Sequence, residues 1–194
     1  MKAFSNLLSD LILTSSRNRK LSLLEQYFSS TPDPDRGYAL AALTGSLNFK
    51  NIKASFFKDL IKEKQDEHLF DLSYDYVGDL AETISLLWDQ EEGGNMPRLS
   101  SLFENLKKAK TDELKNYIIN ILNSSTADQR WAFIKLFTGG LRIGVSSRLV
   151  KQALANYGNV DLDEIEKIWH GLHFPYINLF SWLENKGSKP KISI

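Results

Sequence analysis

The sequence predicts an all-α fold for this chain of 194 residues. Apolar residues recur every three or four positions along most of the chain, which is the period of an amphipathic helix. The alternation that is typical of a strand never persists, and no Asn-Gly or Asp-Gly pair marks a tight hairpin. We therefore expect a single helical domain of roughly ten to twelve helices, and an arrangement in two pseudo-symmetric lobes stays open.

Two amphipathic helices open the chain. Their apolar positions fit helical spacing and are Phe4, Leu7, Leu8, Leu11 and Ile12 in the first and Leu21, Leu23, Leu24, Tyr27 and Phe28 in the second. The segment Thr31-Pro32-Asp33-Pro34-Asp35 interrupts the pattern and restarts it, because proline is tolerated in a first helical turn and aspartate is a good cap. Further helices are expected near residues 36–45, 51–64, 75–89, 98–109, 112–123, 127–138, 145–157, 161–172 and 176–186.

Positive charge is concentrated in one window of a chain whose formal net charge is zero. Residues 129–160 contain no carboxylate and five cations, which are Arg130, Lys135, Arg142, Arg148 and Lys151. Residues 65–92 have the opposite character, with nine acidic residues and no Lys or Arg. This pattern predicts that the protein has one basic and one acidic face. A concentrated positive surface attracts polyanions, so we expect nucleic acid to bind the basic face.

Three glycines lie within the basic window, at positions 139, 140 and 144. Glycine is usually kept where a side chain would block a backbone conformation or a close approach. Ser146 or Ser147 can cap the helix that follows, so its amides and the flanking arginines would form a phosphate site. The alternative is that Gly139 and Gly140 merely end one helix while the cations are solvated, and spacing alone does not decide between the two.

Three segments resemble one known family. Thr138-Gly139-Gly140-Leu141-Arg142-Ile143-Gly144, followed by Lys151-Gln152-Ala153-Leu154, is similar to the signature of the N-terminal DNA-binding domain of ATP-dependent DNA ligases. The similarity is to the replicative type of archaea and eukaryotes and to a related bacterial branch. Tyr76-Val77-Gly78-Asp79-Leu80-Ala81-Glu82 resembles a second segment of that domain, and residues 36–45 resemble an early helix of its bacterial members. The order and separation of the segments also fit, so the resemblance covers nearly the whole chain.

The resemblance implies sequence-independent binding of duplex or nicked DNA through the backbone and minor groove, in DNA repair, replication or recombination. In this family a nucleotidyltransferase domain with a Lys-x-Asp-Gly motif and an oligonucleotide-binding barrel follow, and neither is present in the sequence. We expect residues 1–185 to form the DNA-binding domain and residues 186–194 to form a linker toward the nucleotidyltransferase domain. No catalysis and no cofactor are expected in this domain, whereas the parent ligase is expected to use ATP and magnesium.

The expected DNA contacts centre on Arg142, whose planar guanidinium can bind a phosphate or enter a narrow groove. The glycines would let the main chain approach sugar and phosphate, and Arg148 and Lys151 would neutralise further phosphates. The full expected set is Thr138, Gly139, Gly140, Arg142, Gly144, Ser146, Arg148, Lys151, Arg19, Lys20 and Lys53. For Arg19, Lys20 and Lys53 the competing interpretation is chance clustering of solvated charges.

Other functions have less support in the sequence. Glu166, His170 and His173 have a helical spacing that could place three metal ligands on one face, but the apolar residues around them favour a structural role. The chain lacks cysteine, which excludes disulfides, and its N-terminus is neither a secretion signal nor a membrane span. We expect a cytoplasmic, nucleoid-associated protein. The alternative function is a helical interaction scaffold whose basic face binds an acidic protein.

Overall fold

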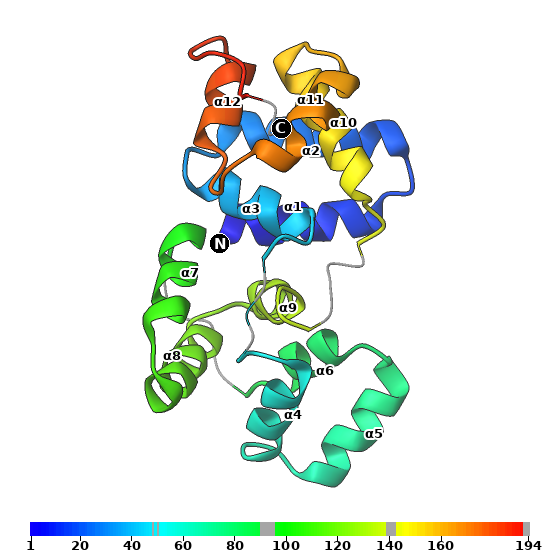
Figure 1. Ribbon diagram of the computed structural model, residues 1–194. Coiled ribbons are helices and arrows are strands. Elements are labelled where there is room, and N and C mark those ends of the chain that lie inside the picture. The colour runs from blue at the N-terminus through cyan, green and yellow to red at the C-terminus, as the bar shows by residue number, and fades with distance from the viewer. Residues whose placement is uncertain (48, 50, 90–95, 139–142, 192–194) are drawn as a thin grey trace. The chain divides into compact units, whose positions relative to one another are not determined.

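The computed structural model describes residues 1–47, 49, 51–89, 96–138 and 143–191. Within these ranges the chain forms twelve α-helices and one 3-10 turn, with no strand (Figure 1). The predicted all-α class is therefore confirmed. None of the described helices is both long and apolar enough to cross a membrane. The chain divides into two compact units, made of residues 1–6 with 48–141 and of residues 7–47 with 142–194.

The first unit is built mainly from six helices that follow one another along the chain. They are α4 (Ala54–Lys62), α5 (Glu67–Val77), α6 (Leu80–Leu87), α7 (Leu99–Lys108), α8 (Thr111–Asn123) and α9 (Ala127–Lys135). Within this unit α6 packs against α5 and α9. The core contains a cluster of aromatic rings whose neighbouring centroids lie 5.0 to 6.3 Å apart, formed by Phe49, Phe57, Phe103, Phe133 and Phe137.

The single helix predicted near residues 75–89 is wrong, because two helices meet there. α5 ends at Gly78, whose φ of 75° lies in the left-handed region that glycine adopts at little cost. α6 then begins after Asp79, whose carboxylate accepts a hydrogen bond from the backbone N–H of Glu82 at 2.9 Å. The segment resembling the ligase family around residue 78 is therefore a junction between two helices.

None of the predicted helix ranges covers the part of α5 before residue 75. Phe70 is buried in the first unit, but Leu69 and Leu72 point away from it and are exposed. Apolar residues on opposite sides of one helix weaken the periodic pattern from which amphipathic helices are recognised.

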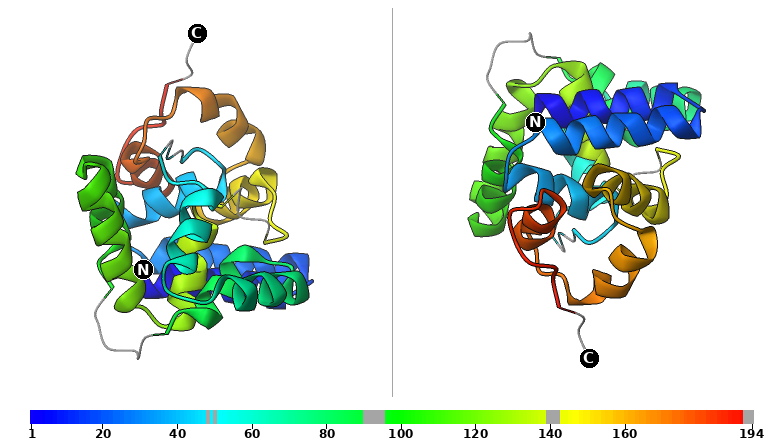
Figure 2. Two further views of the ribbon diagram at one scale, coloured as in Figure 1. Left: turned by 90° about the horizontal axis from the view of Figure 1, so that it is seen from below. Right: turned by 90° about the horizontal axis from the view of Figure 1, so that it is seen from above.

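The second unit combines an early segment of the chain, residues 7–47, with the segment that begins at residue 142. It contains most of α1 (Lys2–Leu13), α2 (Arg17–Ser30), α3 (Asp35–Leu43), α10 (Ser147–Gly158), α11 (Leu162–Ile168), the 3-10 turn η1 (Trp169–Gly171) and α12 (Ile177–Leu183). α10 packs along α2 and also contacts α3, α11 and α12. Figures 1 and 2 show α10, in yellow, beside α2, which is a lighter blue than α1.

A buried arginine holds this second unit together. The Nε of Arg36 donates to Asp33 at 2.8 Å, one Nη donates to the carbonyl of Phe28 at 3.1 Å, and the other pairs with Glu184. Its guanidinium also lies 4.3 Å from the ring centroid of Phe180 on α12. Burial opposes the charged form, but the hydrogen bonds to Asp33 and Glu184 outweigh it and raise the pKa of Arg36.

The next residue, Gly37, is required by close packing. A Cβ atom at this position would lie 1.7 Å from the carbonyl oxygen of Pro175. This distance is far below van der Waals contact, so a side chain here would push α3 away from the segment that precedes α12. The family-like segment at residues 36–45 thus acts in the packing of the second unit.

Candidate nucleic-acid interface

Cations of the basic window at residues 129–160 are largely held within the fold. Arg130 is 5% exposed and donates to the carbonyls of Ser85 at 3.2 Å and Ser125 at 2.7 Å. Lys135 pairs with Asp79, which belongs to the acidic segment of the sequence. The predicted division into a basic and an acidic face is therefore wrong for these two residues, because their charges are directed to partners in the first unit.

Lys151 also has a partner inside its own unit. Its ammonium donates to Glu166 at 2.8 Å and lies 4.6 Å from the ring centroid of Trp169, and its side chain is 13% exposed. This cation is already balanced, so it is a weaker candidate for phosphate neutralisation than the sequence predicted. Glu166, which was considered as a metal ligand together with His170 and His173, is thus paired with Lys151. No group of three His, Asp or Glu side chains suited to a metal ion occurs among the described residues.

The second unit brings the starts of α2 and α10 together. The Nζ of Lys20 donates to the carbonyl oxygen of Gly144 at 2.8 Å, which joins two predicted site residues that are 124 positions apart in the sequence. Gly144 has a φ of 67°, and a Cβ atom there would lie 2.9 Å from the same Nζ. We call the surface at these two helix starts the basic corner, formed by Arg17, Arg19, Lys20, Gly144, Ser146 and Arg148.

Both helices of the basic corner begin with a serine cap and lack acidic residues in their first turns. Ser16 accepts from the N–H of Arg19 at 3.3 Å, and Ser146, not Ser147, accepts from Leu149 at 3.1 Å. Cations at the positive end of a helix dipole cost about 0.3 to 1 kcal/mol each. A bound anion would reverse this cost, because it attracts both the amides and the side chains.

The side chains of Arg17, Arg19 and Arg148 are exposed. No ion pair to any of them occurs in the described ranges of the chain. Their charges are therefore available to an external anion. Arg17 was not among the expected contacts, although a cation directly after a serine cap was a usable signal.

The other expected contacts lie elsewhere. Thr138 follows α9 in the first unit and donates to the carbonyl of Ile134 at 3.0 Å. Lys53 is exposed at the N-cap position of α4, also in the first unit. Gly139, Gly140 and Arg142 lie outside the described residues, so their roles stay predictions.

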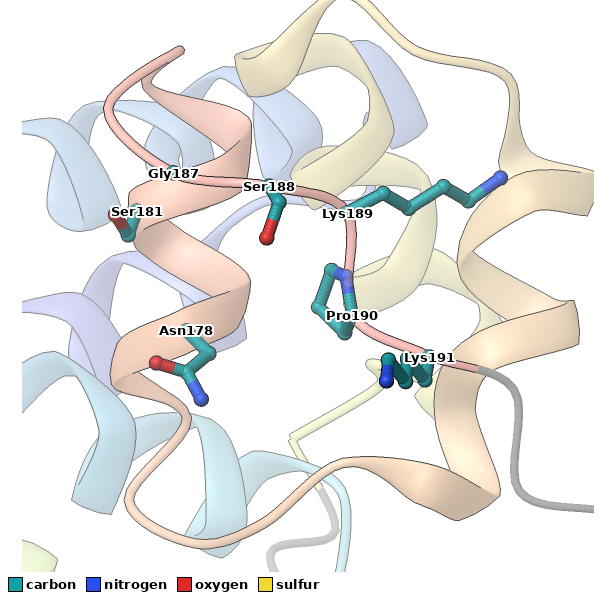
Figure 3. Close-up of a pocket in the computed structure, with 7 residues that line it drawn as sticks. All are labelled: Asn178, Ser181, Gly187, Ser188, Lys189, Pro190 and Lys191. Atoms are coloured by element: carbon teal, nitrogen blue, oxygen red, sulfur yellow. The ribbon is translucent and has the colours of Figure 1, made fainter.

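The segment expected to be a linker contacts the rest of the second unit through Gly187 and Lys189. Lys189 donates to Glu164 of α11 at 3.0 Å, and a Cβ on Gly187 would lie 2.6 Å from the hydroxyl of Ser181. A depression with a volume of about 340 Å³ lies beside this segment. Figure 3 shows the residues that line it, which are Asn178, Ser181, Gly187, Ser188, Lys189, Pro190 and Lys191. Because Lys189 is engaged with Glu164, the basic corner is the better candidate for an anion.

A model of the family described as DNA ligase N terminus matches residues 1–155. The match includes the whole basic corner and the three segments singled out in the sequence. α11 and α12 lie beyond it. No curated protein was found to match the chain.

Proposed function

Since the chain belongs to the family of N-terminal domains of ATP-dependent DNA ligases, we propose that it binds duplex or nicked DNA without sequence preference. The resemblance seen in the sequence is confirmed, and the family gives the chain a DNA ligase context with DNA as substrate. The observation that carries the proposal is the basic corner, where two helix starts present cations in place of acids.

The chemistry of the basic corner suits the DNA backbone. Phosphates occur at every nucleotide, so amides and guanidinium groups that bind them carry no sequence information. Lys20 fixes Gly144 next to the start of α2, which keeps the two helix starts on one surface. The exposed Arg148 can then neutralise one phosphate while Arg17 and Arg19 neutralise others. Arginine side chains of this kind can also enter the narrow minor groove.

Catalysis is assigned in this proposal to other domains of the same polypeptide. The sequence contains no Lys-x-Asp-Gly motif, so AMP transfer from ATP with Mg²⁺ would take place on the nucleotidyltransferase domain. The helical domain formed by this chain would hold nicked DNA for the nucleotidyltransferase domain and for the oligonucleotide-binding barrel. We place this activity at the nucleoid, in DNA repair, replication or recombination.

The proposal is tested by measuring the affinity of the chain for two duplexes of unrelated sequence, each intact and nicked, by fluorescence anisotropy. Similar affinities for both sequences are expected, with a steep loss between about 50 and 200 mM salt as counterions are released. A strong preference for one sequence, or no binding at low salt, would refute the proposal. Binding of polyglutamate in place of DNA would instead favour the scaffold with an acidic protein partner.

The role of Arg142 is tested in the same assay. Arg142→Ala should weaken binding by roughly 1 to 2 kcal/mol, the size of a charge-assisted contact, while the helix content measured by circular dichroism stays the same. An unchanged binding curve would remove this residue from the interface.

A further inference from the structure

A surface of a different kind lies on α5 of the first unit. Leu69, Leu72 and Tyr76 are 47%, 56% and 92% exposed. Their spacing of three and four residues places them on one side of the helix, whereas Phe70 is buried in the core. Single exposed apolar residues are common, but a continuous row on one helix usually marks a binding surface. We call these three residues the α5 stripe.

The charged residues of α5 itself are acidic, and Lys58 and Lys62 of α4 lie over the rings of Tyr74 and Phe70, on the side of α5 away from the stripe. Residues 65–89 contain no Lys or Arg, and Asp75 is exposed on α5. Glu67 and Asp71 lie farther from the stripe around the helix and face Lys62 of α4, at 2.5 and 3.9 Å. Asp75 lies between that edge and the stripe, so an unbalanced carboxylate borders the apolar row.

We propose that the α5 stripe is a docking surface for a basic amphipathic helix of a partner protein. Apolar side chains of the partner, three or four residues apart, would cover Leu69, Leu72 and Tyr76, and its flanking Lys or Arg side chains would pair with Asp75. The acidic residues of α5 disfavour nucleic acid and anionic lipid, and a second copy of the stripe would bring like charges together. This proposal is independent of DNA binding by the basic corner.

The test uses the whole ¹⁵N-labelled chain and two synthetic peptides with the same apolar helical pattern, one flanked by lysines and the other by glutamates. The lysine peptide should shift the amide signals of α5 in a saturable titration, and the glutamate peptide should not. The double variant Leu72→Ser/Tyr76→Ser should lower the affinity by roughly tenfold or more, because it removes two apolar contacts.

Leu13→Ser is the matched control, because Leu13 is 84% exposed at the end of α1, outside the stripe, and its replacement should leave the titration unchanged. The single variant Tyr76→Ser tests the same surface if the double variant is unstable. Equal binding of both peptides, or no shift on α5 with the lysine peptide, would overturn the proposal. Self-association of the chain that the double variant abolishes would assign the stripe to a second copy and also overturn it.

Discussion

Replacing Arg148 by alanine should weaken DNA binding and make it less sensitive to salt. Arg148 is exposed in the first turn of α10, and that turn contains no acidic residue. Its full charge is therefore available to one phosphate. Loss of one phosphate contact lowers the slope of log K against log salt by about 0.9. It should also reduce the binding free energy by about 1.5 kcal/mol, which is roughly a tenfold loss of affinity at low salt.

Comparison with Lys151→Ala makes this prediction specific. The charge of Lys151 is balanced by Glu166 at 2.8 Å, so its removal should change the salt slope by much less than removal of Arg148. Lys167→Ala, which removes an exposed cation in the last turn of α11, is the control for a general loss of positive charge. Fluorescence anisotropy over a salt series gives the slopes, and circular dichroism checks the fold. A slope change for Lys151→Ala as large as that for Arg148→Ala would refute the reasoning.

Three further predictions concern stability, measured by urea unfolding. Gly37→Ala should destabilise the chain by about 3 kcal/mol, because its Cβ would lie 1.7 Å from the carbonyl oxygen of Pro175. Gly78→Ala should cost only about 1 to 2 kcal/mol, because φ is 75° but no atom lies within 4 Å; equal losses at the two glycines would contradict the steric argument. The hydrogen bond from Lys186 lowers the pKa of Glu184; burial opposes this shift and Arg36 adds to it. The ionised Glu184 therefore stabilises the fold above its unfolded pKa of about 4.3, and this stability is lost as the pH falls through the lower pKa of the folded state. Glu184→Gln should therefore show a smaller loss of stability on acidification, and identical pH profiles for the two proteins would exclude this role.

The family-like segments could be recognised in the sequence, but their physical roles could not. Residues 36–45 were predicted as a helix, yet only the structure shows Arg36 binding three partners and Gly37 packing against Pro175. Gly78 and Asp79 belong to a segment that resembles the ligase family, and in the structure they form the end of α5 and the cap of α6. A motif identifies relatives without telling which of its residues touch the ligand and which hold the fold.

The sequence by itself determined the features that depend on neighbouring residues. The helical class follows from apolar spacing, the serine cap of α10 follows from the residues beside it, and membership of the ligase family follows from three ordered segments. The helical class and the cap are local properties, because the hydrogen bonds of a helix join residues at most four positions apart. Family membership needs only the residues of each segment and their order, which the sequence states directly.

The tertiary structure alone decided which charges are available. Lys20 reaches Gly144 across 124 positions, and Lys135 reaches Asp79 across 56, and nothing in the order of residues specifies either contact. The number of charges in a stretch of sequence does not tell which of them lie exposed on the folded surface. Burial and pairing decide this for each charge, and they leave Arg17, Arg19 and Arg148 exposed where α2 and α10 begin, while Lys135 and Lys151 are paired within their own units.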